Sequence, residues 1–293
     1  MKWQGRRRSS NVQDVRGRRV SGGRGAGIGT IINVVLRMFG IKGIAVLAVL
    51  GIIGWQMGLI DPVTLLGGGG GQVQEVDYEG TPEENQRLQF VSVVLADNED
   101  IWTREFNRLG RTFAEPELFV FKGRVQTGCG LGDARMGPFY CPGDQNIYID
   151  LGFYDDLARQ FEAPGDFAQA YVIAHEVGHH IQKLLGISDQ VNAKRGQPDF
   201  NEYSVRLELQ ADYIAGVWAH HNQRYLDRGD IEEAVRAANQ IGDDAIQSRT
   251  QGRVTPHAFT HGTSEQRMRW FQRGLESGRL EDGDTFDMPY QSL

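Results

Sequence analysis

The stretch that decides the fold reads His175-Glu176-Val177-Gly178-His179, an H-E-x-x-H pattern. On a helix, side chains four residues apart lie one turn apart on the same face, so both imidazoles can reach one metal ion. Glu176 follows the first histidine directly, where its carboxylate can act as general base toward a water molecule. The pattern therefore predicts a catalytic zinc site on a helix.

The flanking residues predict a helix over about 166–185, which begins after Gly165 and ends at Gly186. The alternative to a zinc-binding helix is a solvated helix that carries two unrelated histidines. Small and apolar neighbours disfavour this alternative, because they are typical of a buried helix. These neighbours are Ala174, Val177, Gly178 and Ile181.

A catalytic zinc site needs a third protein ligand, and the sequence offers Glu208. Glu208 and Asp212 lie four residues apart on a predicted, largely apolar helix over about 202–224. Carboxylates in such packing are costly unless they are paired or bound to metal. One would bind zinc, and the other would accept the N–H of a ligand histidine. An exposed acid pair is the alternative, and His220 or His221 as third ligand is disfavoured because both lie three turns further on.

His261 lies just before a last predicted helix, over about 264–277. A histidine in this place, close to a metal site, could stabilise the oxyanion of a tetrahedral intermediate. On the residues alone, a capping or core role for His261 is the stronger interpretation.

The order of the predicted elements indicates an α+β fold, helix-rich with a small early β-sheet. Alternating or aromatic stretches predict strands over 118–121 and 146–150. Thr81-Pro82 begins a helix. The further predicted helices cover about 99–109, 153–161, 166–185, 202–224, 231–248 and 264–277.

Charge is divided unevenly along the 293 residues, whose net charge is −7. Residues 1–42 carry ten basic side chains and one acidic side chain, so the other 251 residues carry −16. The basic head has no interleaved aromatic residues and no nucleic-acid motif, so we expect no nucleic-acid partner. A composition with 40% apolar residues argues against wholesale disorder, and two cysteines are too few for a Cys-only zinc site.

Residues 43–60 are 18 uncharged residues that span about 27 Å as a helix, close to the hydrocarbon core of a bilayer. We expect one uncleaved transmembrane anchor, while a cleaved signal peptide and a buried core helix are the alternatives. By the positive-inside rule, residues 1–42 stay in the cytoplasm. A Gly-rich linker over 61–80 then leads to an extracytoplasmic domain over 81–293.

Cys129 and Cys141 lie in a Gly-rich loop, too far apart for a C-x-x-C redox pair. Outside the cytoplasm disulfides persist, so we expect a structural disulfide between them. Two free thiols are the main alternative.

Motifs along nearly the whole chain resemble the bacterial "putative neutral zinc metallopeptidase" family, and the pair of metal-site helices resembles the gluzincins. The resemblance implies a zincin-like domain with one zinc ion held by His175, His179 and Glu208. It also implies Glu176 as base and Asp212 as the acid behind a ligand histidine. The stretch around His261 is similar to one in membrane-bound M48-type peptidases, which favours a place for His261 in the site. The motifs are Met1–Arg7, Thr127–Gly130, Gly137–Pro142, Tyr148–Leu151, Asp166–Gln169, Tyr171–Gln182, Glu208–Asp212 and Phe259–Ser264.

The resemblance also carries one expectation about the substrate and one departure. In zincins an edge strand binds extended substrate, and the strand over 146–150 is placed for this role, with Tyr148 and Tyr140 as contacts. Many relatives carry cysteines where this chain has Tyr213 and, approximately, Gly283. We therefore expect no second disulfide.

Together these patterns predict a membrane-anchored zinc endopeptidase that cleaves protein or peptide substrates outside the cytoplasmic membrane. One alternative is a non-catalytic zinc domain that binds or chaperones a partner. Another is a metal hydrolase that acts on a non-peptide substrate. The presence of Glu176 favours an enzyme, because a structural zinc ion has no use for a base.

Overall fold

The computed structural model describes residues 1–20 and 73–293. These residues form two units, one of Met1–Gly17 with Asp77–Leu293 and one within Arg18–Val76. In the second unit, β2 (Arg18–Val20) pairs antiparallel with β3 (Val73–Glu75). The predicted anchor, 43–60, lies outside the described residues, and none of the helices described is long and apolar enough to cross a membrane.

A four-stranded sheet forms one layer of the larger unit, in the order β1-β4-β8-β7. Strands β1 (Val12–Asp14), β4 (Leu118–Phe121) and β8 (Asn146–Asp150) run parallel. Strand β7 (Phe139–Cys141) is antiparallel to β8 and forms the edge. The strand predicted as the edge, β8, is therefore an inner strand, because the short β7 segment covers it. Strands β5 (Arg124–Thr127) and β6 (Gly130–Asp133) form a separate hairpin.

The first helix among the described residues, α3 (Pro82–Arg108), is continuous, whereas the sequence suggested two helices. Thr81 begins it with a capping box that includes Glu84. The polar side chains of Asp97, Asn98 and Glu99 are buried in the middle of this helix. They are tolerated inside one helix because the N-terminal segment supplies partners for Asp97 and Glu99.

The remaining helices follow the sheet, and most match their predicted ranges. The predicted helix over 231–248 is divided at Gly242, where a Cβ atom would lie 2.4 Å from the backbone nitrogen of Ser264. The helices are α4 (Phe153–Arg159), α5 (Asp166–Leu184), α6 (Ile187–Asn192), α7 (Phe200–His221), α8 (Asp230–Gln240), α9 (Asp243–Gln251) and α10 (Ser264–Ser277).

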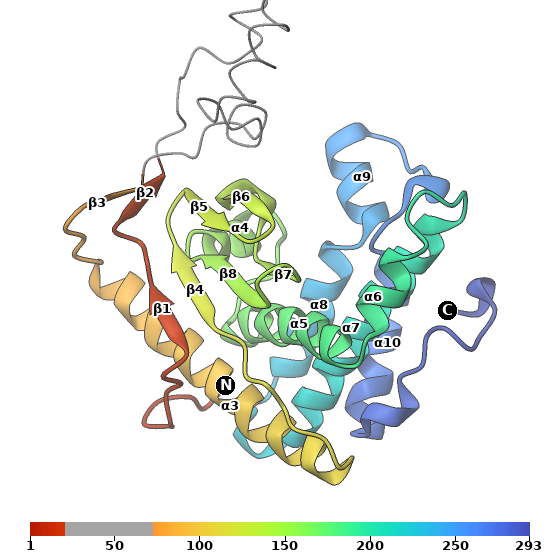
Figure 1. Ribbon diagram of the computed structural model, residues 1–293, viewed down its shortest axis with the longest axis horizontal. Helices are drawn as coiled ribbons and strands as arrows, with labels where there is room; N and C mark the ends of the chain where they lie inside the picture. The colour runs from red at the N-terminus through yellow and green to blue at the C-terminus, as the bar shows by residue number, and fades with distance from the viewer. Residues whose placement is uncertain (21–72) are drawn as a thin grey trace, which may run out of the picture. The chain divides into compact units, whose positions relative to one another are not determined.

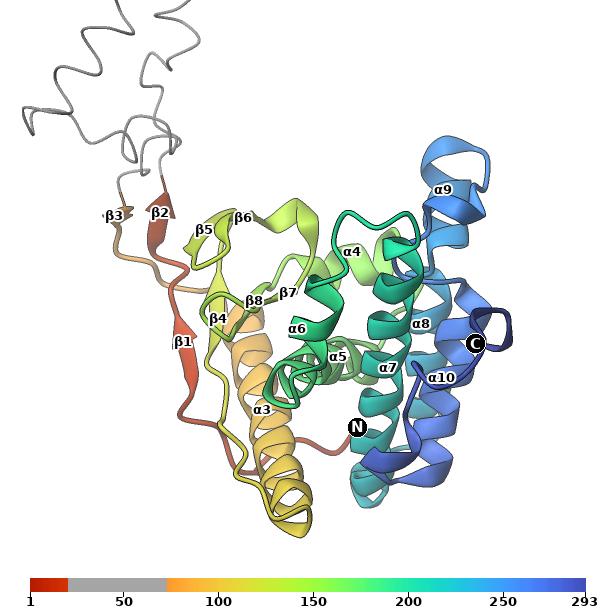
Figure 2. The ribbon, with the colours of Figure 1, turned by 45° about the vertical axis from the view of Figure 1, so that its right-hand side comes forward.

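Helix α5 lies at the centre of the unit (Figure 1). It packs against β7 and β8 on one side and against α7 and α8 on the other, and α10 packs along α7 (Figure 2). Its residues are almost all buried, as the apolar flanks of the H-E-x-x-H pattern indicated. The helix-rich α+β class is thereby confirmed.

The N-terminal residues 1–17, expected as part of a separate basic segment, pack in the same unit as residues 77–293. Strand β1 pairs with β4, Trp3 packs edge-on against Phe90 at 5.6 Å, and Arg7 lies 2.9 Å from Glu99. These apolar and ionic contacts join residues 1–17 to residues 77–293.

Cys129 and Cys141 form the expected disulfide, with an S–S distance of 2.05 Å. Cys129 lies in the turn between β5 and β6, and Cys141 ends the edge strand β7. The bond therefore ties the exposed hairpin to the sheet edge beside α5.

Candidate metal centre

Two packed helices supply the predicted metal ligands. His175 and His179 lie on α5, and Glu208 lies on α7. The helices approach closely at Gly178, where a Cβ atom would lie 3.1 Å from the Cα atom of Ala211. A glycine opposite an alanine thus brings the two ligand-bearing helices within reach of one ion.

The three ligand side chains converge as a zinc ion requires. Nε2 of His175 lies 3.2 Å from Oε2 of Glu208, and Nε2 of His179 lies 3.5 Å from Oε1 of Glu208. A tetrahedral zinc site with bonds of about 2.0–2.2 Å separates its ligand atoms by about 3.3–3.5 Å. The three residues form a group that could hold a metal ion, with ligand atoms that lie within 4.8 Å of one another. The donor set therefore fits zinc.

The other ring nitrogen of each histidine has its own partner. Nδ1 of His175 lies 2.8 Å from Oδ1 of Asp212, and Nδ1 of His179 lies 2.9 Å from Oε1 of Gln182. With Nδ1 donating to these oxygens, Nε2 of each ring keeps its lone pair for the metal. Asp212 thus occupies the place expected for the acid behind a ligand histidine.

Asp212 is fully buried, yet its carboxylate stays ionised. Burial acts to raise its pKa, but Arg267 and His175 outweigh burial and lower the pKa to about 2. Nε of Arg267 donates to Oδ2 at 2.8 Å, and the hydroxyl of Tyr171 donates to Oδ1 at 2.5 Å. A buried charge is stable only with such partners.

Arg267 is a site residue to which the sequence pattern assigned no role. It lies on α10 and its side chain is 3% exposed. A signal was present, because a basic side chain on the buried face of a predicted amphipathic helix requires a carboxylate nearby. Only the packing of α10 on α7 identifies that carboxylate as Asp212.

The predicted base, Glu176, faces the same cavity as the three ligands. Burial raises the pKa of Glu176, while the neighbouring His179 and His175 partly oppose this rise. The carboxylate is therefore a stronger base than an exposed glutamate. The cavity has a volume of about 430 Å³, and its wall is mostly apolar, with residues that include Phe139, Phe153, Phe161, Val172, Ile241 and Ile246.

His261 lines this cavity and is half exposed, so the structure does not place it in the core. Its Nδ1 lies 3.3 Å from Oδ1 of Asp243, and this interaction is the main cause that raises the pKa of His261. Oδ2 of Asp243 accepts backbone N–H groups from Thr260 and His261, both at 2.6 Å. Asp243 therefore fixes the loop that presents the imidazole.

The two tyrosines proposed to contact substrate lie in different environments. Tyr140, on the edge strand β7, lines the cavity. Tyr148 is not among the cavity residues. It is 3% exposed, stacks at 5.2 Å on both Phe119 and Phe139, and donates its hydroxyl to Asp144 at 2.7 Å. The proposed contact at Tyr148 is therefore corrected, because β8 is an inner strand.

The remaining histidines near the motif helices lie outside the ligand set. Nε2 of His180 donates to the carbonyl of Ala114 at 2.6 Å. His220 and His221 contact the carbonyl oxygens of Leu275 and Gly278 at the far end of α7. These contacts leave Glu208 as the candidate for the third ligand.

Comparison with known proteins agrees with this geometry. Residues 1–286 match the family described as "putative neutral zinc metallopeptidase". The chain belongs to this family. Its relatives include "Uncharacterized protein YpfJ" of Escherichia coli strain K12, 46% identical over 98% of this chain and 99% of that protein. A second relative is "Uncharacterized protein Rv2575" of Mycobacterium tuberculosis, 41% identical over 59% of this chain and 63% of that protein. No solved structure matches the chain.

The family resemblance had placed cysteines of relatives at Tyr213 and Gly283. These two positions are neighbours in space, because a Cβ atom on Gly283 would lie 2.3 Å from Cδ1 of Tyr213. The tyrosine ring fills the space beside the glycine, and the Tyr213 hydroxyl donates to the carbonyl of Arg279 at 2.7 Å. The only two cysteines of the chain form the one disulfide, as expected.

Proposed function

We propose that this protein is a zinc-dependent endopeptidase that hydrolyses peptide bonds outside the cytoplasm. One observation carries the proposal: three candidate zinc ligands converge at the wall of a cavity that Glu176 also lines. A structural zinc ion would have four protein ligands, whereas a catalytic one keeps a position open. Among the described residues no fourth ligand joins the group.

The chain's own side chains have defined tasks in this reaction. Zinc, when bound, polarises the scissile carbonyl and lowers the pKa of water toward about 7. Glu176 accepts the proton of the attacking water and returns it to the leaving amine. His261, whose pKa the Asp243 carboxylate raises, donates a hydrogen bond in its protonated form to the carbonyl oxygen as negative charge develops there.

Substrate would bind beside the edge strand β7. This strand pairs with β8 on one side, and no other described strand pairs with it. An extended peptide can add to such an edge through backbone hydrogen bonds. The apolar wall of the cavity favours peptides with apolar side chains next to the scissile bond.

The test compares Glu176→Gln and Glu208→Ala in the full chain, with mixed folded and unfolded proteins as substrates. We expect Glu176→Gln to lose at least about 100-fold in chelator-sensitive cleavage and to keep one zinc ion per chain. Glu208→Ala should lose the zinc ion itself. Glu202→Gln, an exposed change on the same helix, is the matched control. Cleavage by Glu176→Gln at the wild-type rate would contradict the mechanism.

The same experiment separates the two rival functions. Stoichiometric zinc without cleavage of any protein would favour a non-catalytic domain that binds a partner. Chelator-sensitive hydrolysis of esters or cell-wall fragments, with no peptide cleavage, would favour a non-peptide substrate.

We also propose that the catalytic unit lies at the outer face of the cytoplasmic membrane, attached through the apolar run 43–60. The disulfide supports the oxidising side of the membrane. Because residues 1–17 belong to the same unit, the proposal places them on that side too, so the run 43–60 would attach the unit to the membrane without crossing it as a single span.

Labels at Lys2 and at the C-terminus test this placement. In intact spheroplasts, protease added from outside should remove a tag at either position. Protection of the Lys2 tag alone would show that the two segments lie on opposite sides, against the packing described above.

A further inference from the structure

We propose that Gln182 is a positioning residue that holds the His179 imidazole with Nε2 toward the metal, and that Gln210 fixes the direction of the Gln182 amide. The inference rests on the part of the proposed function that makes His179 a zinc ligand. It concerns residues to which the H-E-x-x-H pattern assigns no role.

The two ligand histidines are oriented by different chemistry. Nδ1 of His175 faces the carboxylate of Asp212, which also accepts hydrogen bonds from Arg267 and Tyr171. His179 points Nδ1 at an uncharged amide, that of Gln182, from one turn further along α5. An amide, unlike a carboxylate, can turn a donor or an acceptor toward a histidine. The direction of the Gln182 amide therefore decides which nitrogen of His179 is free.

Backbone carbonyls fix that direction. Nε2 of Gln182 lies 2.7 Å from the carbonyl oxygen of Leu207, which can only accept a hydrogen bond. The amide nitrogen must therefore face Leu207, and the amide oxygen must face His179. Nδ1 of His179 then has to donate, so Nε2 of His179 is the unprotonated nitrogen that a metal needs.

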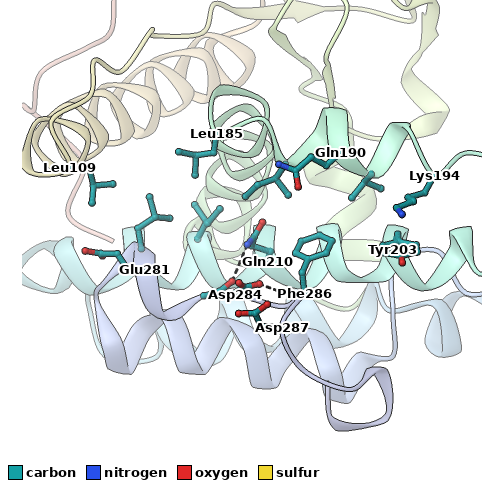
Figure 3. Close-up of a pocket in the computed structure, with 15 residues that line it drawn as sticks. Leu109, Leu185, Gln190, Lys194, Tyr203, Gln210, Glu281, Asp284, Phe286 and Asp287 are labelled. Carbon is teal, nitrogen blue, oxygen red and sulfur yellow. Dashed lines mark hydrogen bonds between the residues drawn. The ribbon is translucent and has the colours of Figure 1, made fainter.

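Gln210 fixes the direction of the Gln182 amide in the same way. Its Nε2 lies 3.1 Å from the carbonyl oxygen of Gly283, so its own oxygen must face Gln182, at 3.1 Å. Figure 3 shows Gln210 on α7 beside Asp284 and Phe286 of the C-terminal segment, in a second cavity of about 480 Å³. The chain of hydrogen bonds thus runs from the metal ligand to a different face of α7.

The contact with Leu207 has a second effect, because Leu207 directly precedes the ligand Glu208 on α7. One fully buried side chain therefore contacts His179 on α5 and the backbone beside Glu208. We infer that Gln182 sets the position of two ligands relative to each other as well as the tautomer of one.

The test measures zinc affinity of the full chain by competition with a chelator, together with thermal unfolding and the visible spectrum of the Co²⁺-substituted protein. Gln182→Met keeps the length of the side chain and removes both hydrogen bonds. We expect it to weaken zinc binding by about 10–100-fold, the usual effect of losing a partner of a ligand histidine, and to alter the Co²⁺ spectrum. Gln210→Met should have a smaller effect in the same direction.

Two further variants separate positioning from folding. Gln182→Glu keeps an oxygen that can accept from His179 but loses the donor to Leu207. It should lower the melting temperature and keep more of the zinc affinity than Gln182→Met does. Gln190→Met changes a glutamine that lines the second cavity outside this chain of hydrogen bonds, and it should leave affinity and spectrum unchanged.

Wild-type zinc affinity and an unchanged Co²⁺ spectrum in folded Gln182→Met would overturn the inference. A wild-type chain that binds zinc and cleaves no peptide would contradict the endopeptidase, and the affinity comparison would still decide the role of Gln182. A wild-type chain that binds no zinc would overturn both.

Discussion

At the scale of single residues, the site depends on buried polar groups that satisfy one another. Asp212 accepts hydrogen bonds from Tyr171, His175 and Arg267 and has no exposed surface. The ligands and Asp212 were predictable because residues four apart share a helix face. Arg267 and Gln182 were not assigned, because their roles depend on which side chains meet across α5, α7 and α10.

Asp212→Asn tests this network. An asparagine oxygen can accept only part of these hydrogen bonds, and Arg267 is left as a buried charge without a counter-ion. We expect zinc affinity to fall about 10–100-fold and the free energy of unfolding to fall by about 3–5 kcal/mol. Chelator competition and denaturant unfolding measure the two effects, with the exposed Asp199→Asn at the start of α7 as control. Unchanged zinc affinity in Asp212→Asn would count against the orienting role.

At the scale of elements, α7 and α10 pack backbone to backbone. A Cβ atom on Gly216 would lie 2.1 Å from the carbonyl oxygen of Phe271, and one on Gly274 would lie 2.0 Å from that of Tyr213. This close approach carries Arg267 of α10 to Asp212 of α7. Sequence periodicity located both helices, but it could not predict the contact, because glycines within a helix indicate neither a partner nor a distance.

Gly216→Ala should therefore separate the two helices. We expect a loss of at least about 1–3 kcal/mol in the free energy of unfolding, as for other overpacked cores, and a lower zinc affinity as Arg267 moves away from Asp212. Thermal and denaturant unfolding measure the loss. Gln272→Ala, an exposed change on α10, should have little effect. Equal stability of Gly216→Ala and wild type would show that the helices can move apart freely.

At the scale of the whole molecule, the larger unit is assembled from two distant parts of the sequence. Residues 1–17 supply strand β1 and two arginines that form ion pairs with α3. Arg6 pairs with Asp97, and Arg7 pairs with Glu99 and Asp100. From the sequence we predicted that these basic residues determine the membrane topology. Charge counts do not show which acidic side chains lie opposite the basic ones in the folded chain. The alternating pattern of β1 is also too short to be read as a strand.

Asp97 gives this interface a dependence on pH. Burial raises the pKa of Asp97 to about 7, although the charge of Arg6 acts to lower it. The folded chain therefore holds the proton more tightly than the unfolded chain, whose aspartate pKa is about 3.9. The stability that protonated Asp97 contributes is fully present below about pH 4. It is lost as the pH rises toward 7, and the loss in the free energy of unfolding is on the order of 4 kcal/mol.

Asp97→Asn removes this titration. We expect wild type to lose free energy of unfolding between pH 4 and pH 7, whereas the variant should not. The curves of stability against pH for wild type and variant should therefore converge or cross. Denaturant unfolding at several pH values measures the difference, with Asp199→Asn as control. Parallel curves for wild type and Asp97→Asn would show that Asp97 keeps an ordinary pKa.

Because β1 pairs with β4 and residues 1–17 form ion pairs with α3, we expect that the larger unit does not need an intact covalent connection between its two parts. A protease site engineered between residues 21 and 72 would cut the chain into two polypeptides. The hydrogen bonds of β1 and the ion pairs with α3 would still join residues 1–17 to the rest. We expect the two pieces to elute together as one folded particle, with the N-terminal piece behaving as a complementing peptide that dissociates only on denaturation.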